Sequence, residues 1–145
     1  MIAHQSIVNL LMATQANYRL RATDRFLQQS SISFDMTLIE IWLPLAIGAC
    51  IVPAAARAQQ DAPKLLQQIS EAKISVAGLV PSELTMWLEA GLSGRTAPNL
   101  RVLMTGGEAL TPALAARTYN ALPEVSLIQM YGPTEVRLPL EVQLH

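Results

Sequence analysis

The sequence predicts an α/β fold in which a mostly parallel sheet is flanked by helices, and three observations support it. Short apolar runs of strand length alternate roughly four times with longer stretches of helical spacing. Most of the helical stretches begin at a Ser, Thr, Asp or Pro, which are residues suited to a helix start. The segments that follow the strands are rich in glycine and polar residues, whereas those that follow the helices are ordinary connectors. At 145 residues, the chain has the size of a single domain with a substantial core.

The first half of the chain is predicted to contain, in order, helix 6–18, strand 26–30, helix 37–47, strand 49–52 and helix 61–73. Ser6 is a suitable N-cap for the first helix. Pro44 predicts a kink or an end within the second helix, and Gly48 can stop that helix in a left-handed conformation. Asp61, with Pro63 close behind it, has the pattern of a helix start.

The second half is predicted to contain strand 74–77, helix 81–90, a loop at 91–98, strand 100–104, helix 111–122 and strand 125–129. Pro81 and Ser82 open the first of these helices, and Thr111 and Pro112 open the second. The strands are short apolar runs, which is typical of the buried strands of a parallel sheet.

Composition argues against several classes of function. The net charge of -1 gives no electrostatic footprint for nucleic acid or for an anionic membrane. The longest apolar stretch, 41–56, contains Pro44, Gly48 and Pro53 and is too short and broken to cross a bilayer. The lone cysteine, Cys50, cannot form an internal disulfide and is expected to be buried as a small apolar residue. Since the N-terminus does not resemble a signal peptide, we expect a cytoplasmic protein.

Four unusual segments follow predicted strands: 33–35, 78–81, 105–108 and 131–135. Because ligands bind outside the carboxyl ends of the strands in such sheets, these segments predict one shared cleft. Gly106 and Gly107 would let backbone approach a ligand closely, although a tight turn is the simpler explanation. Asp35 lies among apolar residues, where it either caps a helix beginning at Met36, the more frequent role, or pairs with a cationic group.

The last of these segments carries the richest chemistry. Tyr131 offers an aromatic face, Thr134 a hydroxyl for a phosphate oxygen, and Glu135 a carboxylate of the kind that Mg²⁺ prefers. A Gly-Pro turn followed by a Thr cap explains the segment equally well. His4 and His145 stand at the two ends of the sequence, which argues against a metal cluster or a histidine-based triad.

Together these segments resemble the adenylation domains of nonribosomal peptide synthetases, within the wider family of enzymes that form acyl and aminoacyl adenylates. Three motifs carry the resemblance, in the family's order and at similar distances: 33–35 with Glu40 following, Thr-Gly-Gly-Glu-Ala-Leu at 105–110, and Tyr-Gly-Pro-Thr-Glu at 131–135. By this resemblance, residues 1–135 are the central part of an AMP-binding adenylation domain, an incomplete piece of the enzyme's large N-terminal part. Residues 136–145 would be a C-terminal tail outside the family.

The resemblance implies roles for the cleft residues, none of them catalytic. Asp35 would hold the α-ammonium group of an amino acid substrate, since a buried carboxylate needs such a partner. The substrate side chain would meet a group of small or apolar residues: Met36, Ile39, Gly78, Met104, Gly106 and Met130. The nucleotide would be bound by Gly107, Glu108, Ala109, Gln129, Tyr131, Gly132 and Thr134, with adenine between Tyr131 and the 107–109 backbone. Glu135 would help to hold Mg²⁺.

The intact family couples an amino acid to ATP and passes the acyl group to the phosphopantetheine thiol of a carrier protein, beside neighbouring synthetase domains. This sequence departs from the family at Gln129, where an Asn commonly reads the adenine amino group. It also shows no phosphate loop, and its lysines, Lys64 and Lys73, fall on a predicted surface helix rather than in the cleft. We therefore expect a fragment that forms no adenylate by itself, and whether the chain is an enzyme stays open.

Two other interpretations remain. A segment of an acyl- or aryl-CoA ligase would share the fold, but its substrate carries no ammonium group for Asp35. A non-catalytic binding or interaction domain derived from the same fold accounts equally well for the missing lysine and phosphate loop.

Overall fold

The computed structural model describes residues 2–55, 61–132 and 140–143. Its strands are β1 (Arg25–Gln28), β2 (Cys50–Pro53), β3 (Val76–Leu79), β4 (Val102–Thr105), β5 (Ser126–Tyr131) and β6 (Leu140–Gln143). Its helices are α1 (His4–Asn17), the π-helical η1 (Leu38–Trp42), α2 (Leu43–Ile47), α3 (Ala62–Glu71), α4 (Pro81–Glu89) and α5 (Pro112–Ala121). None of the helices in the described part of the chain has the length and apolar character needed to cross a membrane.

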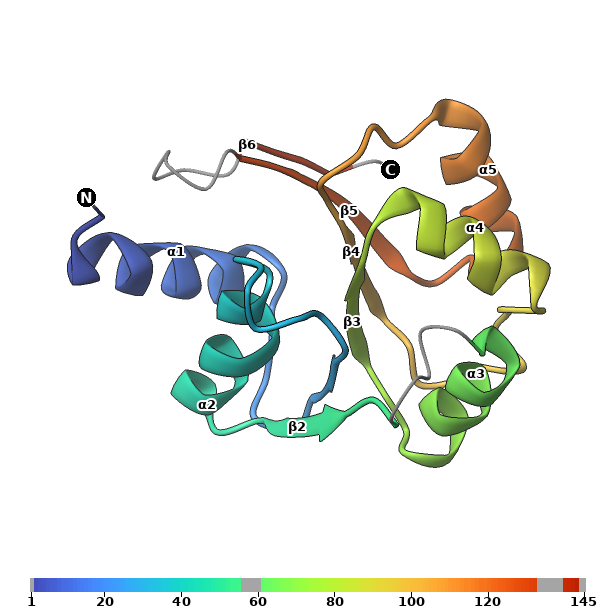
Figure 1. The fold of residues 1–145 in the computed structure, drawn as a ribbon, viewed down its shortest axis with the longest axis horizontal. Helices are drawn as coiled ribbons and strands as arrows, with labels where there is room; N and C mark the ends of the chain where they lie inside the picture. Colours follow the sequence, from blue (N-terminus) through green and yellow to red (C-terminus); the bar gives the residue numbers. More distant parts are fainter. Residues whose placement is uncertain (1, 56–60, 133–139, 144–145) are drawn as a thin grey trace.

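The strands form one sheet in the order β2-β1-β3-β4-β5-β6. The first five are parallel, whereas β6 runs antiparallel to β5, with Leu140 opposite Tyr131. Figure 1 shows α1 and α2 on one side of the sheet and α3, α4 and α5 on the other. The predicted α/β class, a mostly parallel sheet flanked by helices, is confirmed. The strand at 140–143 was not predicted.

The helix boundaries mostly follow the predicted local signals. The side chain of Asp61 accepts a hydrogen bond from the Lys64 amide and so caps α3, and Thr111 caps α5 in the same way through the Leu114 amide. Gly48 ends α2 with a φ of 74°, as the left-handed C-cap requires. Ser6 is not the first cap, because α1 already begins at His4, with Ala3 as its N-cap.

Two further predictions needed correction. Pro44 does not end the helical segment, which continues to Ile47; it stands in the first turn of α2, just after the change from the π-helical η1 to α-helix. The third and fourth strands begin two residues later than predicted. Ile74 and Leu100 are buried, but their amides bond to the carbonyls of Ile69 and Ala97 in the preceding turns rather than to a neighbouring strand.

The core has two parts, one on each face of the sheet. Successive strand residues point to opposite faces. One face packs against α1, η1 and α2 through Phe26, Val76, Val102, Met104 and Ile128. The other packs against α3, α4 and α5 through Leu27, Ala77, Leu79, Leu103 and Leu127. Burial on both faces explains why these strands read as continuous apolar runs.

A polar network joins the amino ends of β1, β3 and β4, at the edge opposite the strands' carboxyl ends. Asp24, which is 4% exposed, accepts hydrogen bonds from the Arg21 amide at 2.7 Å, from Ser75 Oγ at 2.8 Å and from Arg101 Nε at 2.9 Å. Arg101 Nη2 also contacts the same carboxylate. Burial raises the pKa of Asp24, but the hydrogen bonds from Arg101, Arg21 and Ser75 outweigh it, so the net pKa is lowered.

Cys50 is exposed, which corrects the prediction that it is buried. It lies on β2, the strand at one edge of the sheet, where only β1 covers the backbone and little packs against the side chain.

Candidate functional site

A cavity of about 540 Å³ opens at the carboxyl ends of the parallel strands. Its walls come from the segments that follow β1, β3, β4 and β5, and from α1 and η1. This volume falls within the range of about 300–1,000 Å³ typical of small-molecule sites. The shared cleft predicted from the unusual loops is therefore present.

The cavity brings together residues from all three sequence motifs. Those predicted site residues that line it are Asp35, Met36, Ile39, Gly106, Gly107, Glu108, Met130 and Gly132. They come from the turn before η1, from η1 itself, from the loop after β4 and from the end of β5. Residues almost a hundred positions apart in the sequence therefore share one surface.

Other predicted site residues lie elsewhere. Gly78 stands behind Met36: a Cβ on Gly78 would be 3.3 Å from the Met36 sulfur and 3.5 Å from Glu40 Oε1. Met104 is fully buried within the sheet. Ala109 and Tyr131 are exposed, the latter by 65%, and neither lines the cavity. Thr134 and Glu135 lie outside the described residues.

Asp35 is exposed on the cavity wall. It lies in the turn that leads into η1, where its backbone carbonyl accepts a hydrogen bond of 2.9 Å from the Leu38 amide. The structure therefore contradicts the argument that this carboxylate is buried and so requires a cationic partner. A ligand that covers Asp35 would create that requirement.

The buried carboxylate of this region is Glu40, which is 1% exposed. It accepts hydrogen bonds from the Ser30 amide at 2.9 Å, from Ser30 Oγ at 2.8 Å and from the Gln29 amide at 3.2 Å. Burial raises the pKa of Glu40, and the charge of Glu83 raises it further, while the bonds from Ser30 and Gln29 lower it. Glu40 thus fixes η1 to the end of β1, where Ser30 and Ser31 line the cavity. The sequence signal for this buried carboxylate was that Glu40 is the one acidic residue in the otherwise apolar predicted helix 37–47.

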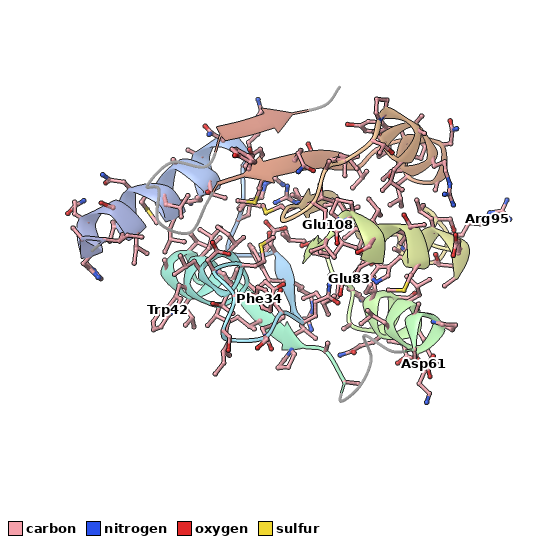
Figure 2. All side chains as sticks on the ribbon, turned by 45° about the horizontal axis from the view of Figure 1, so that its top comes forward. Phe34, Trp42, Asp61, Glu83, Arg95 and Glu108 are labelled. Atoms are coloured by element: carbon pink, nitrogen blue, oxygen red, sulfur yellow. The ribbon has the colours of Figure 1, made fainter. Side chains whose placement is uncertain are left out.

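Glu83 is a cavity residue that the sequence analysis did not identify. It is half-buried in the first turn of α4, and its carboxylate accepts a 3.3 Å hydrogen bond from the Val80 amide. Burial raises the pKa of Glu83, the Val80 bond lowers it, and the charge of Glu108 raises it. Figure 2 shows Glu83 and Glu108 at the same end of α4. The sequence signal for Glu83 was its place at the third position of the predicted helix 81–90, where a Glu side chain commonly accepts a hydrogen bond from the N-cap amide.

The charges that the described residues place on the cavity wall are all negative. Asp35, Glu83 and Glu108 line it, and no Lys or Arg does among the residues that the structure describes. Lys64 lies on α3, with 78% of its side chain exposed and an ion pair of 3.1 Å to Asp61, so its predicted surface position is confirmed. Within the described residues, no group of three or more His, Cys, Asp or Glu side chains could hold a metal ion.

The loop after β4 is held closely by its neighbours. A Cβ on Gly106 would be 3.3 Å from the backbone oxygen of Met130, so β5 and the loop touch through backbone. Gly107 has a φ of 79°, which an L side chain rarely adopts. The Glu108 carboxylate accepts hydrogen bonds of 2.9 Å from both the Ser82 amide and Ser82 Oγ. Gln129 donates to the Glu108 carbonyl at 3.0 Å.

Comparison with known proteins assigns the chain to a family. The profile of the AMP-binding enzyme family matches residues 1–142. A PKS-NRPS hybrid synthetase of Aspergillus candidus is 38% identical over 134 residues, which are 92% of this chain and 5% of that protein. Tyrocidine synthase 3 of Brevibacillus parabrevis is 36% identical over 139 residues, 95% of this chain and 2% of that protein.

The same relationship is visible in solved structures. A four-domain nonribosomal peptide synthetase bound to AMP and glycine has a TM-score of 0.86 and 27% identity, over 99% of this chain and 11% of that one. The chain thus spans only a small part of the proteins it matches. The resemblance to synthetase adenylation domains is confirmed, and the chain belongs to the AMP-binding enzyme family.

Proposed function

We propose that this chain forms the substrate-binding centre of an adenylation domain that activates an amino acid for nonribosomal peptide synthesis. One observation carries the proposal: the cavity gathers Asp35, the Gly106–Glu108 loop and Gly132, one contribution from each motif, at the carboxyl ends of different strands. Such a cavity can hold two reactants side by side, which converts their reaction into an effectively unimolecular step.

The amino acid occupies the η1 side of the cavity. Asp35 receives the α-ammonium group, and the carboxylates of Glu83 and Glu108 on the same wall favour a cation there and disfavour a plain carboxylic acid. Met36, Ile39 and Met130 meet the side chain. Gly78 and Met104 do not line the cavity themselves but lie behind the residues that do. Gly78 leaves room for the Met36 side chain, and Met104 is fully buried in the sheet. An apolar or slender side chain fits these surroundings.

The nucleotide occupies the side formed by the β4 and β5 loops. The backbone of residues 107–109 and the exposed ring of Tyr131 offer the two faces between which adenine stacks. Thr134 meets a phosphate, and the carboxylate of Glu135 is a hard oxygen ligand that fits Mg²⁺. The AMP-binding family and the relative bound to AMP and glycine support this assignment.

In the whole enzyme the amino acid carboxylate attacks the α-phosphorus of ATP, and the bond to pyrophosphate breaks. The aminoacyl adenylate then transfers its acyl group to the phosphopantetheine thiol of a carrier protein, in the cytoplasm. The synthetases among the relatives support this context. We place the end of the adenylation segment at residue 135, although the family profile extends to 142.

The test is binding of non-hydrolysable aminoacyl adenylates to the purified chain, measured by calorimetry. Each analogue, an aminoacyl sulfamoyl adenosine, is paired with its desamino counterpart, which lacks the ammonium group. Asp35→Asn should weaken the amino forms about tenfold, the effect of one hydrogen bond to a charged group, and leave the desamino forms unchanged. Asp61→Asn removes the same charge from α3 and keeps a good helix cap, so it should change neither.

The pattern of binding separates the alternatives. Preference for desamino forms, unaffected by Asp35→Asn, would indicate an acyl- or aryl-CoA ligase segment. Failure of every analogue to bind would indicate a non-catalytic domain and overturn the proposal.

A further inference from the structure

The Gln129 side chain is occupied by the protein itself. Thr105 Oγ1 donates to Gln129 Oε1 at 2.7 Å, and Gln129 Nε2 donates to the carbonyls of Glu108 at 3.0 Å and Met130 at 3.4 Å. A glutamine amide has two N–H donors, so both are directed at backbone carbonyls. Those carbonyls also fix which end of the amide is the nitrogen. Little is left to donate to a ligand without releasing one of these contacts.

The length of glutamine matters for this arrangement. Thr105 and Gln129 are direct partners in the β4–β5 register, and the Gln129 side chain extends past the end of β4 to the carbonyl of residue 108. An asparagine, shorter by one C–C bond of about 1.5 Å, could not hold Thr105 and Glu108 at the same time. Gln129, the residue that departs from the family pattern, therefore has the length that its hydrogen bond to the loop at Glu108 requires.

The same loop is held from its other side. The Glu108 carboxylate accepts from the Ser82 amide and hydroxyl, both at 2.9 Å, in the first turn of α4. Residue 108 thus bonds to β5 through its carbonyl and to α4 through its carboxylate. These bonds are solvent-exposed and individually weak, so the position of the loop depends on having both.

We propose that Gln129 and the Glu108 carboxylate together act as a latch that fixes the Gly106–Glu108 loop between β5 and α4. The base in the neighbouring site is then held by the shape of the loop, and its amino group is not read by Gln129. Gln129 is a positioning residue. The part of this proposal that concerns the base rests on the proposed function, whereas the latch itself does not.

The latch is tested on the purified chain without ligand, by NMR-detected hydrogen exchange at the Ser82 amide. Gln129→Ala should free the loop and accelerate that exchange about fivefold, the effect of one ordinary hydrogen bond. Gln129→Glu keeps the size but turns an acceptor toward the two carbonyls, so it should act as strongly as Gln129→Ala. Gln129→Asn should also release the loop. Gln67→Ala, the same change on the exposed surface of α3, should leave exchange at Ser82 unchanged.

Base recognition is tested by titrating each variant with AMP and with IMP, which carries an oxygen in place of the amino group. If Gln129 positions the loop, Gln129→Ala weakens both nucleotides by the same factor of about five and leaves their ratio unchanged. Ser82→Ala, which loosens the latch from α4, should also weaken both.

Three results would overturn parts of the proposal. A change in the AMP-to-IMP ratio on Gln129→Ala would show that Gln129 reads the base. Unchanged Ser82 exchange in both Gln129→Ala and Gln129→Glu would show that there is no latch. If the wild-type chain binds neither nucleotide while exchange responds as expected, the latch stands, and the base statement and the proposed nucleotide site both fail.

Discussion

Gly107 offers a direct test of how the loop conformation supports the site. Its φ of 79° is in the left-handed region, and a Cβ there would lie 3.5 Å from Val80 Cγ1, which is ordinary contact. Gly107→Ala therefore adds backbone strain without a steric clash. The left-handed conformation costs an alanine about 1–2 kcal/mol. The reduced freedom of the unfolded chain returns about 0.4–1 kcal/mol. A net loss of about 1 kcal/mol in the free energy of unfolding is expected.

The strain can be relieved if the loop leaves its position, which links stability to ligand binding. A penalty of about 1 kcal/mol on the binding-competent loop corresponds to roughly a fivefold loss of affinity for AMP. Urea denaturation followed by tryptophan fluorescence measures the first effect, since Trp87 is 2% exposed and reports on the core. Calorimetric titration with AMP measures the second.

Gly91→Ala is the matched control. Gly91 has a φ of 99°, no atom lies within 4 Å of its added Cβ, and it follows α4 at the end away from the cavity. It should lose comparable stability and keep its affinity for AMP. The reasoning is refuted if the two variants lose AMP affinity equally, or if Gly107→Ala is as stable as the wild type.

Two predictions concern pH. The lowered pKa of Asp24 means that its stabilising contribution is present above the ordinary value of 3.8 and is lost as pH falls through the folded-state value. Asp24→Asn should therefore flatten the decline of the urea midpoint between about pH 6 and 3; an unchanged slope would count against the network. The raised pKa of Glu40 has the opposite effect on stability: the stabilising contribution of Glu40 is present below its ordinary value of 4.5 and is lost as pH rises through the folded-state value. Glu40→Gln should gain stability relative to the wild type from pH 4 to 8, and a constant difference would contradict this.

The sequence by itself determined the order of the elements from α1 to β5 and the existence of the cleft. Both depend on signals that act within a few residues: caps at Asp61 and Thr111, the stop at Gly48, and apolar runs bounded by polar turns. Parallel strands then place their carboxyl ends at one edge, whatever the order in which they pair. The motif residues Asp35, Gly106, Gly107 and Gly132 were found together for that reason.

Only the tertiary structure decided which side chains are exposed and which residues contact each other. Cys50 and Asp35 lie in or beside apolar sequence, yet both are exposed, because β2 is an edge strand and the 33–35 turn faces the cavity. Met36 covers Gly78, although the two are more than 40 positions apart in the sequence. This contact depends on the packing of the η1 region over β3, which the sequence does not reveal. A sequence pattern specifies which face of an element is apolar, but not which element will cover it.

The same reason explains Gln129. Its motif position indicated a nucleotide contact, but its hydrogen bonds run to Thr105 and Glu108, more than 20 residues away. A polar side chain on a strand bonds to whatever the neighbouring strand presents, and that depends on register and on the path of the next loop. Local chemistry therefore identified the residues of this site, while the packing of β4 against β5 determined what their polar atoms can still reach.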